Sequence, residues 1–365
     1  MFTINEMCIT PPADFLLRAE CPVDASPQQG QGGALRLSTS RDSRAVWVDV
    51  ARVIATLLIV VYHMPSSCFP KSAEPEVIRM VMDFFYRAGG PLFFFFFISG
   101  YFTPFHLSRD KRLKRIMMLM LVFVVWNCLF ACGVRDEVSF ARIFGLMGNP
   151  CADYPMWYVV ALVELLLIQA SGVGGCVLFL LGALWYVVWN ENSWPFPLQD
   201  YVIVPSPLFV VGFMVGCLSS ACRLEVLRRI FIGAAPAFLF IYACHLSPLV
   251  DIAMSAGLLL SFGGALQAIW PRCAAWIAWL APASFLCYAV HAGVILGGSQ
   301  ILDKFFPEAL DSGLVYGLFP MLIYAGSVAG FAGLKRYIPR LLPALAYSGR
   351  VAAVDWLIVR LSRRG

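Results

Sequence analysis

The sequence predicts an all-α, polytopic integral membrane protein with about ten transmembrane helices and both termini in the cytoplasm. Hydrophobic residues make up 60% of its 365 residues, and charged residues make up only 13%. A soluble domain is instead about half apolar and about a quarter charged. The apolar residues also fall into runs of roughly 17 to 25, which is the length that crosses a bilayer as a helix.

Apolar runs of this length follow one another along most of the chain. The expected spans are 46–64, 79–104, 116–133, 156–170, 173–189, 203–220, 229–245, 248–267, 275–298 and 313–334. In the second of these, Gly89, Gly90 and Pro91 suggest a break in the helix. The small pair Ser99 and Gly100 further along would allow another helix to pack closely.

The charges between the spans indicate the orientation of the chain. Basic residues gather in alternate segments, such as 109–115 (RDKRLKR) and the C-terminal tail, whereas the other loops lean acidic, as at Glu74 and Asp136. Lys and Arg are typical of cytoplasmic loops, so an even number of spans follows, with both ends inside. The net charge of +5 is therefore no evidence for nucleic acid, and we expect none as a partner.

We divide the chain into three parts. Residues 1–44 are polar and rich in Gly, Ser and Gln, which predicts a disordered cytoplasmic tail, and they lack the basic and then apolar pattern of a signal peptide. Residues 45–336 form the expected transmembrane domain. Residues 337–365 form a basic cytoplasmic tail, whose end is either an amphipathic helix on the membrane or a solvated segment. The twelve cysteines are scattered, so we expect neither a disulfide framework nor a metal site.

The first span carries three ionisable residues that lipid disfavours: Asp49, Arg52 and His63. His63 is eleven positions after Arg52, and eleven steps of about 100° return to within about 20° of the same helix face, about 16 Å further along. Asp49 is placed for an i,i+3 ion pair with Arg52. Taken singly, Arg52 could reach the inner headgroups and His63 could be an interfacial residue. Their shared face favours a functional site.

Five more residues are candidates for binding a substrate, although each also has a simpler interpretation. Arg87 lies in the outer part of the second span, or in a loop if the helix begins at Pro91. Ser99 would serve close helix packing, and Trp157 the aromatic belt of the membrane. Tyr288 and His291 share one stripe of a helix, which forms either a wall of a site or a polar seam between helices.

Six motifs occur in order along residues 46–334. They are DVAR followed after ten residues by His63, then PLFFFFFISGYF, RLKRI, MWYVVALVELLLI, PLFVVGFMVGCL and SFLCYAVH. In this order they resemble the motifs of acyltransferase family three, whose members are integral-membrane acyltransferases that mostly modify cell-envelope carbohydrates. The resemblance implies an O-acyltransferase of the bacterial cytoplasmic (inner) membrane. Its donor substrate would be acyl-CoA, typically acetyl-CoA, and its acceptor a hydroxyl of a polysaccharide or lipid-linked glycan, with no permanently bound cofactor.

The resemblance also implies roles for the candidate residues. His63 would be the general base, or alternatively a nucleophile that carries the acyl group. Arg52, oriented by Asp49, would bind the phosphates of the donor or polarise its thioester. Arg87 and His291 would stabilise the oxyanion or bind the acceptor. A transporter or flippase for a sugar or lipid-linked substrate is the alternative, because intramembrane charges also suit transport. The sequence indicates neither the acceptor nor the oligomeric state.

Overall fold

The structure, a computed structural model, describes most of the predicted membrane domain. The described residues are 45–64, 74–85, 90–133, 157–172, 207–244, 248–310 and 312–346, with single residues at 174, 175, 177 and 181. Within these ranges every regular element is a helix and none is a strand, which confirms the all-α prediction for this part of the chain. The predicted N-terminal tail, 1–44, lies outside the described residues.

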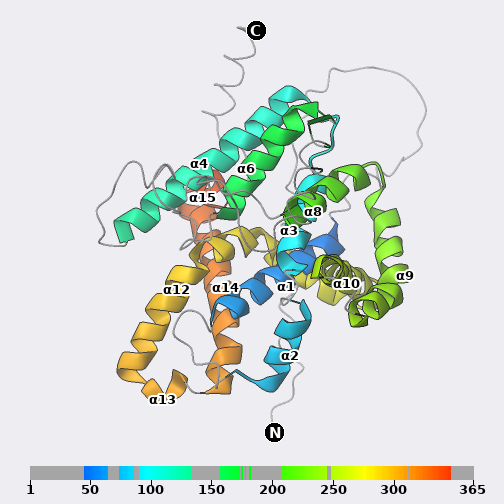
Figure 1. The fold of residues 1–365 in the computed structure, drawn as a ribbon. Coiled ribbons are helices and arrows are strands. Elements are labelled where there is room, and N and C mark those ends of the chain that lie inside the picture. The colour runs from blue at the N-terminus through cyan, green and yellow to red at the C-terminus, as the bar shows by residue number, and fades with distance from the viewer. Residues whose placement is uncertain are drawn as a thin grey trace, which may run out of the picture. The chain divides into compact units, whose positions relative to one another are not determined.

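Helix α1 (Val46–His63) is the central element of the described residues. Eleven of its 18 residues are buried, including polar Asp49 and Thr56. Its neighbours are α3 (Gly90–Tyr101), α10 (Pro248–Ile269), α11 (Pro271–Leu280), α12 (Ser284–Phe305) and α14 (Gly313–Tyr337), as Figure 1 shows. A helix with neighbours on several sides has to be apolar around most of its circumference. This explains why most residues of α1, apart from its three ionisable ones, are apolar.

Five helical stretches among the described residues are long and apolar enough to cross a membrane. They are α1, α9 (Leu224–Ala243), Val250–Ile269 within α10, Pro271–Phe305, and α14. This confirms several membrane spans. Other predicted spans fall wholly or partly outside the described residues, as 173–189 does. The count of ten and the orientation of both termini therefore stay predictions.

Two predicted spans differ from the helices observed. The expected span 79–104 holds most of α2 (Glu76–Phe85) and all of α3, and the predicted break at Gly89, Gly90 and Pro91 falls where α3 begins, at Gly90. The expected span 275–298 covers the end of α11 and the first part of α12, and a 3₁₀ turn, η5 (Ala281–Ala283), separates these two helices. Pro282 explains this turn, since proline lacks the N–H that an α-helix requires and its ring disturbs the preceding turn. Hydropathy does not register such a break.

Helices α3 and α8 (Pro207–Ser219) approach each other backbone to backbone. A Cβ atom added at Gly100 would lie 2.0 Å from the carbonyl oxygen of Phe213, and one added at Gly216 would lie 2.0 Å from that of Phe97. Only glycine fits at either position. The close packing predicted at Gly100 is thereby confirmed, and it follows the small-residue rule of membrane helix pairs.

The other helices pack in pairs: α4 with α6, α9 with α10, and α15 with α4. In Figure 1, α4 (Arg109–Gly133) lies beside α6 (Trp157–Ala170), and α9 lies beside α10. The short helix α13 (Pro307–Leu310) joins α12 to α14. Helix α15 (Leu342–Ala346) contacts α4, where the indole of Trp126 donates a hydrogen bond of 3.0 Å to the carbonyl oxygen of Leu345. The first part of the predicted C-terminal tail therefore packs against a helix.

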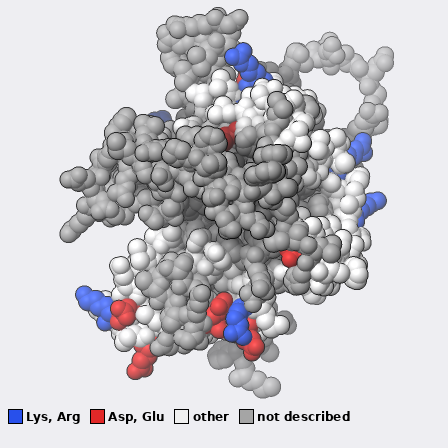
Figure 2. Space-filling view, viewed as in Figure 1, with Lys and Arg blue, Asp and Glu red and all other residues white. Residues whose placement is uncertain are grey.

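On the face that Figure 2 shows, charged side chains of the described residues form small groups, among them one near α2 and one near α12 and α13. Lipid-facing residues account for such a surface, because α9 and α14 expose large apolar side chains such as Phe240, Leu314 and Leu322. This distribution agrees with a multi-pass membrane protein.

Candidate active site

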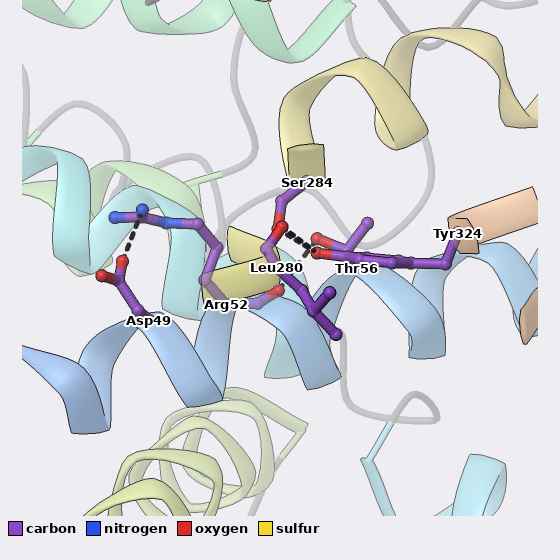
Figure 3. A network of polar contacts seen from close by, with 6 residues as sticks. All are labelled: Asp49, Arg52, Thr56, Leu280, Ser284 and Tyr324. Carbon is purple, nitrogen blue, oxygen red and sulfur yellow. Dashed lines mark hydrogen bonds and ion pairs between the residues drawn. The ribbon is translucent and has the colours of Figure 1, made fainter. Parts of the chain in front are cut away.

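The inner end of α1, in the predicted orientation, carries an ion pair formed within the helix. Arg52 Nη1 donates to Asp49 Oδ1 at 2.7 Å, and Figure 3 shows both side chains on one side of α1. The Asp49 side chain is only 9% exposed, whereas that of Arg52 is 31% exposed. The carboxylate is therefore held inside the protein, and the guanidinium remains partly accessible. The predicted i,i+3 pair is present.

The other end of α1 brings two histidines together. The rings of His63 and His291 have their centroids 5.0 Å apart and are inclined by 42°. His291 is buried in α12, while His63 is half-buried as the last residue of α1. His291 Nδ1 lies 2.6 Å from the carbonyl oxygen of Tyr288. A carbonyl can only accept, so Nδ1 carries the hydrogen and Nε2 of the neutral ring carries the lone pair.

Core packing sets the contact between these two histidines. Val60, one turn before His63, and Cys287, one turn before His291, are both completely buried in the same apolar cluster. This cluster fixes α1 against α12, so that the next turn of each helix brings its imidazole to the other. Nothing local in either segment predicts the pair.

Buried side chains fill the stripe between the two ends of α1. Thr56 and Ile59 lie between Arg52 and His63 on the same face, and both are almost completely buried. Thr56 Oγ1 donates to the carbonyl oxygen of Arg52 at 2.9 Å, and Ile59 belongs to an apolar cluster with Phe96. A donor that reached from Arg52 to His63 would therefore pass beside these side chains or displace them. Thr56 could have been found in the sequence, since it is four residues from Arg52.

A polar network provides a hydrogen-bond partner for the backbone carbonyl of Leu280 at the break between α11 and α12. The Tyr324 hydroxyl lies 3.2 Å from the carbonyl oxygen of Leu280 and 2.7 Å from Ser284 Oγ. Because the single proton of Tyr324 goes to the carbonyl, Ser284 donates to Tyr324. Backbone groups freed inside a membrane need such partners. Figure 3 shows this network beside Thr56 and close to the ion pair of α1. Tyr324 was missed in the sequence, because nothing in the pattern of the apolar helix α14 distinguishes it from the other tyrosines there.

The candidate Ser99 connects through Tyr158 to Tyr288, and Tyr288 lies against His291. Ser99 Oγ lies 2.9 Å from the Tyr158 hydroxyl, and the rings of Tyr158 and Tyr288 have their centroids 5.9 Å apart. The Tyr288 ring lies 5.7 Å from that of His291. The structure thus brings Ser99, Tyr288, His291 and His63 into one continuous cluster contributed by α1, α3, α6 and α12.

The remaining candidates are not placed. Arg87 lies outside the described residues, and although Trp157 begins α6, its side chain also lies outside them.

In the basic run at the start of α4, Arg112 donates to the carbonyl oxygens of Phe105 and Leu107, at 3.2 and 3.3 Å. Arg115 donates to Thr103 Oγ1. These two arginines therefore hold the loop between α3 and α4.

Metal-ligating residues do not cluster in the described part of the chain. Among these residues, no three or more His, Cys, Asp or Glu side chains lie close enough to hold an ion. The chemistry that the arrangement offers is that of an imidazole pair and a guanidinium. Imidazole serves as a base or nucleophile near neutral pH, and guanidinium binds oxyanions.

Comparison with known proteins gives one match. A family model described as an acyltransferase domain matches residues 45–334. No match was found among curated proteins or among solved structures. The matched stretch begins one residue before α1 and ends inside α14, so it contains the ion pair, both histidines and Tyr324.

Proposed function

Because this chain belongs to acyltransferase family 3 and is a multi-pass membrane acyltransferase, we propose that it transfers an acetyl group from acetyl-CoA to a hydroxyl of a cell-envelope carbohydrate. The acceptor is a polysaccharide or a lipid-linked glycan. The enzyme works in the bacterial inner membrane, with both termini in the cytoplasm. Acetyl-CoA is a substrate, and no cofactor is bound permanently.

The observation that carries this proposal is the distribution of functional groups along α1. One end presents a partly exposed guanidinium that is already oriented by Asp49. The other end presents a half-buried imidazole in contact with a second one. Guanidinium matches the phosphates of a CoA donor through its planar fork. Imidazole is the side chain best suited to activate a hydroxyl at neutral pH.

In this proposal Arg52 binds the donor and His63 performs the chemistry. His63 either removes the proton of the acceptor hydroxyl or accepts the acyl group itself, and both require its ring at the reacting carbonyl. Asp49 keeps Arg52 in position. Donor and acceptor meet at the cluster that contains Ser99, Tyr288 and His291, and these side chains bind them.

Arg87 and Trp157 complete the proposed substrate-binding residues. Arg87 would stabilise the negative oxygen that develops in the transition state, or bind the acceptor, because a guanidinium donates to oxyanions. Trp157 would bind the carbohydrate through its ring. Trp157 lies in the motif MWYVVALVELLLI, and Arg87 lies four residues before the motif PLFFFFFISGYF.

The test is acyl transfer by the purified protein in proteoliposomes. Radiolabelled acetyl-CoA and envelope glycans are supplied, and mass spectrometry identifies any acetylated glycan. We expect an O-acetylated product from the wild type and none from His63→Ala, with equal membrane insertion of both. Full acetylation by His63→Ala would remove this residue from the mechanism. Accumulation of unmodified glycan inside the vesicles, without acetylation, would instead indicate a transporter or flippase.

A further inference from the structure

We propose that His63 and His291 divide the reaction between them, so that His63 carries the acyl group and His291 is the base for the acceptor hydroxyl. This inference rests on the proposed function and deepens it. It makes His291 a catalytic residue that meets the reacting hydroxyl, whereas the sequence placed it among substrate-binding residues.

A covalent route creates a need that His63 cannot meet alone. Once one ring nitrogen of His63 holds the acyl group, that ring can no longer accept the proton of an incoming hydroxyl. A hydroxyl is a poor nucleophile until a base removes its proton, so a second base has to lie beside the acylated ring. A one-step transfer needs one base only and leaves the second histidine without a chemical task.

The structure supplies a second base in the required place. The two ring centroids are 5.0 Å apart, so the two imidazoles lie side by side. The hydrogen bond from Nδ1 to the Tyr288 carbonyl fixes the tautomer of His291 and leaves the lone pair on Nε2. His291 therefore needs no rearrangement before it accepts a proton.

The burial of the two rings assigns the two roles. His291 is only 1% exposed, so a bulky thioester cannot reach it before it reaches His63. His63 is half-buried at the end of α1 and is the ring that an entering donor meets. Proton transfer needs only the acceptor hydroxyl, or one bridging water, within hydrogen-bond reach of the buried nitrogen, whereas acylation needs the whole thioester group at the ring. The exposed ring is thus the nucleophile, and the buried ring is the base.

The two steps balance as follows. In the first, a His63 nitrogen bonds to the thioester carbonyl carbon, the carbon–sulfur bond breaks, and the proton on the other His63 nitrogen goes to sulfur to give the free thiol of CoA. In the second, the acceptor oxygen bonds to the acyl carbon and the carbon–nitrogen bond breaks. The hydroxyl proton passes to His291 Nε2 and from there to His63. Both histidines end neutral, and the products are an ester and CoA.

The test separates the two steps with His291→Gln. Wild type and variant in proteoliposomes receive radiolabelled acetyl-CoA without acceptor, the protein-bound label is measured after rapid quenching, and acceptor glycan is then added. We expect both proteins to take up label on His63, and the label of the variant to discharge to the acceptor about 10²- to 10⁴-fold more slowly, which is the usual effect of losing a general base. His63→Ala should take up none.

Ser299→Ala is the matched control. Ser299 is another buried polar residue of α12, and its hydroxyl bonds to the Leu296 carbonyl of the same helix, so this variant should label and discharge like the wild type. A His291→Gln protein that discharges at the wild-type rate would overturn the inference. One that loses labelling as well would assign His291 to structure and overturn it too.

Failure of the inference is distinguishable from failure of the proposed function. A wild-type protein that acetylates the glycan without ever holding label on His63 would overturn the two-step route and leave the acyltransferase intact. A wild-type protein that neither holds label nor acetylates any envelope glycan would overturn both.

Discussion

The two ends of α1 carry their functional groups in different ways. Arg52 is oriented by Asp49, three residues earlier in the same helix, so its geometry is set as soon as the helix forms. His63 is oriented against His291 by the packing of α1 on α12, which joins distant parts of the chain. The position of Arg52 is thus set by contacts within one helix, and the position of His63 is set by the packing of two helices in the folded core. We therefore expect binding and chemistry to respond to different substitutions.

The largest effect is expected at the histidine end. His63→Ala removes the group that activates the acceptor or carries the acyl chain, and kcat should fall by about 10²- to 10⁴-fold. The KM for acetyl-CoA should change little, because the arginine end is intact. Steady-state kinetics in proteoliposomes measure both constants. If the KM for acetyl-CoA rose and kcat did not change, His63 would bind the donor, and both ends of α1 would serve binding.

The next effect is expected at the arginine end. Arg52→Ala removes charge-assisted hydrogen bonds to the donor, each worth about 1.5–3 kcal/mol, so the KM for acetyl-CoA should rise about 10- to 100-fold. The kcat at saturating donor should stay near that of the wild type, since the lost binding is the same in ground state and transition state. If kcat fell and KM did not change, Arg52 would act on the reacting carbonyl.

A smaller effect is expected at the helix break beside the arginine end. Tyr324→Phe removes the hydroxyl that satisfies the Leu280 carbonyl and should lower the free energy of unfolding by about 1 kcal/mol. Thermal unfolding of the detergent-solubilised protein measures this. The control is Ser327→Ala on the same helix, whose hydroxyl donates to the Ile323 carbonyl of its own helix, and whose loss should matter less. Equal stabilities of the two variants would show that the break needs no partner.

The smallest expected effect is the interaction free energy between substitutions at the two ends, that is, the departure of Arg52→Ala and His63→Ala from additivity in acetyl-CoA affinity. They lie about 16 Å apart along α1, and sites at such a separation without shared partners usually add to within about 0.5 kcal/mol. The loss of acetyl-CoA affinity caused by Arg52→Ala should therefore be the same in the wild type and in His63→Ala. Calorimetric titration of the four proteins measures it. A coupling well above that value would mean that the two ends act as one unit.

The same contrast explains what could be predicted from the sequence. The stripe of Asp49, Arg52 and His63 follows from helical periodicity, which operates within one element, and the all-α membrane class follows from composition. The contact of His63 with His291 could not be predicted, because it depends on which faces of α1 and α12 pack together. Tyr324 was missed for a similar reason, since its role becomes visible only beside the turn at Pro282.

The helix bounds show the same limit. Hydropathy averages over a turn and treats 79–104 as one apolar run, whereas the residue types Gly89, Gly90 and Pro91 predicted a break there, and α3 begins at Gly90. The glycines of α8 could be recognised in the sequence, but their partner could not. The backbone of α3 fills the space left by Gly216, and only the structure identifies α3 as that partner.

The contact between α3 and α8 has a consequence for how substrates enter. Two helices whose backbones touch at Gly100 and Gly216 cannot slide past each other without first separating, so they move as one body. This pair carries Ser99 and forms a stiff wall for the cluster near the histidines. The opening that admits a donor or an acceptor therefore has to come from elsewhere around α1.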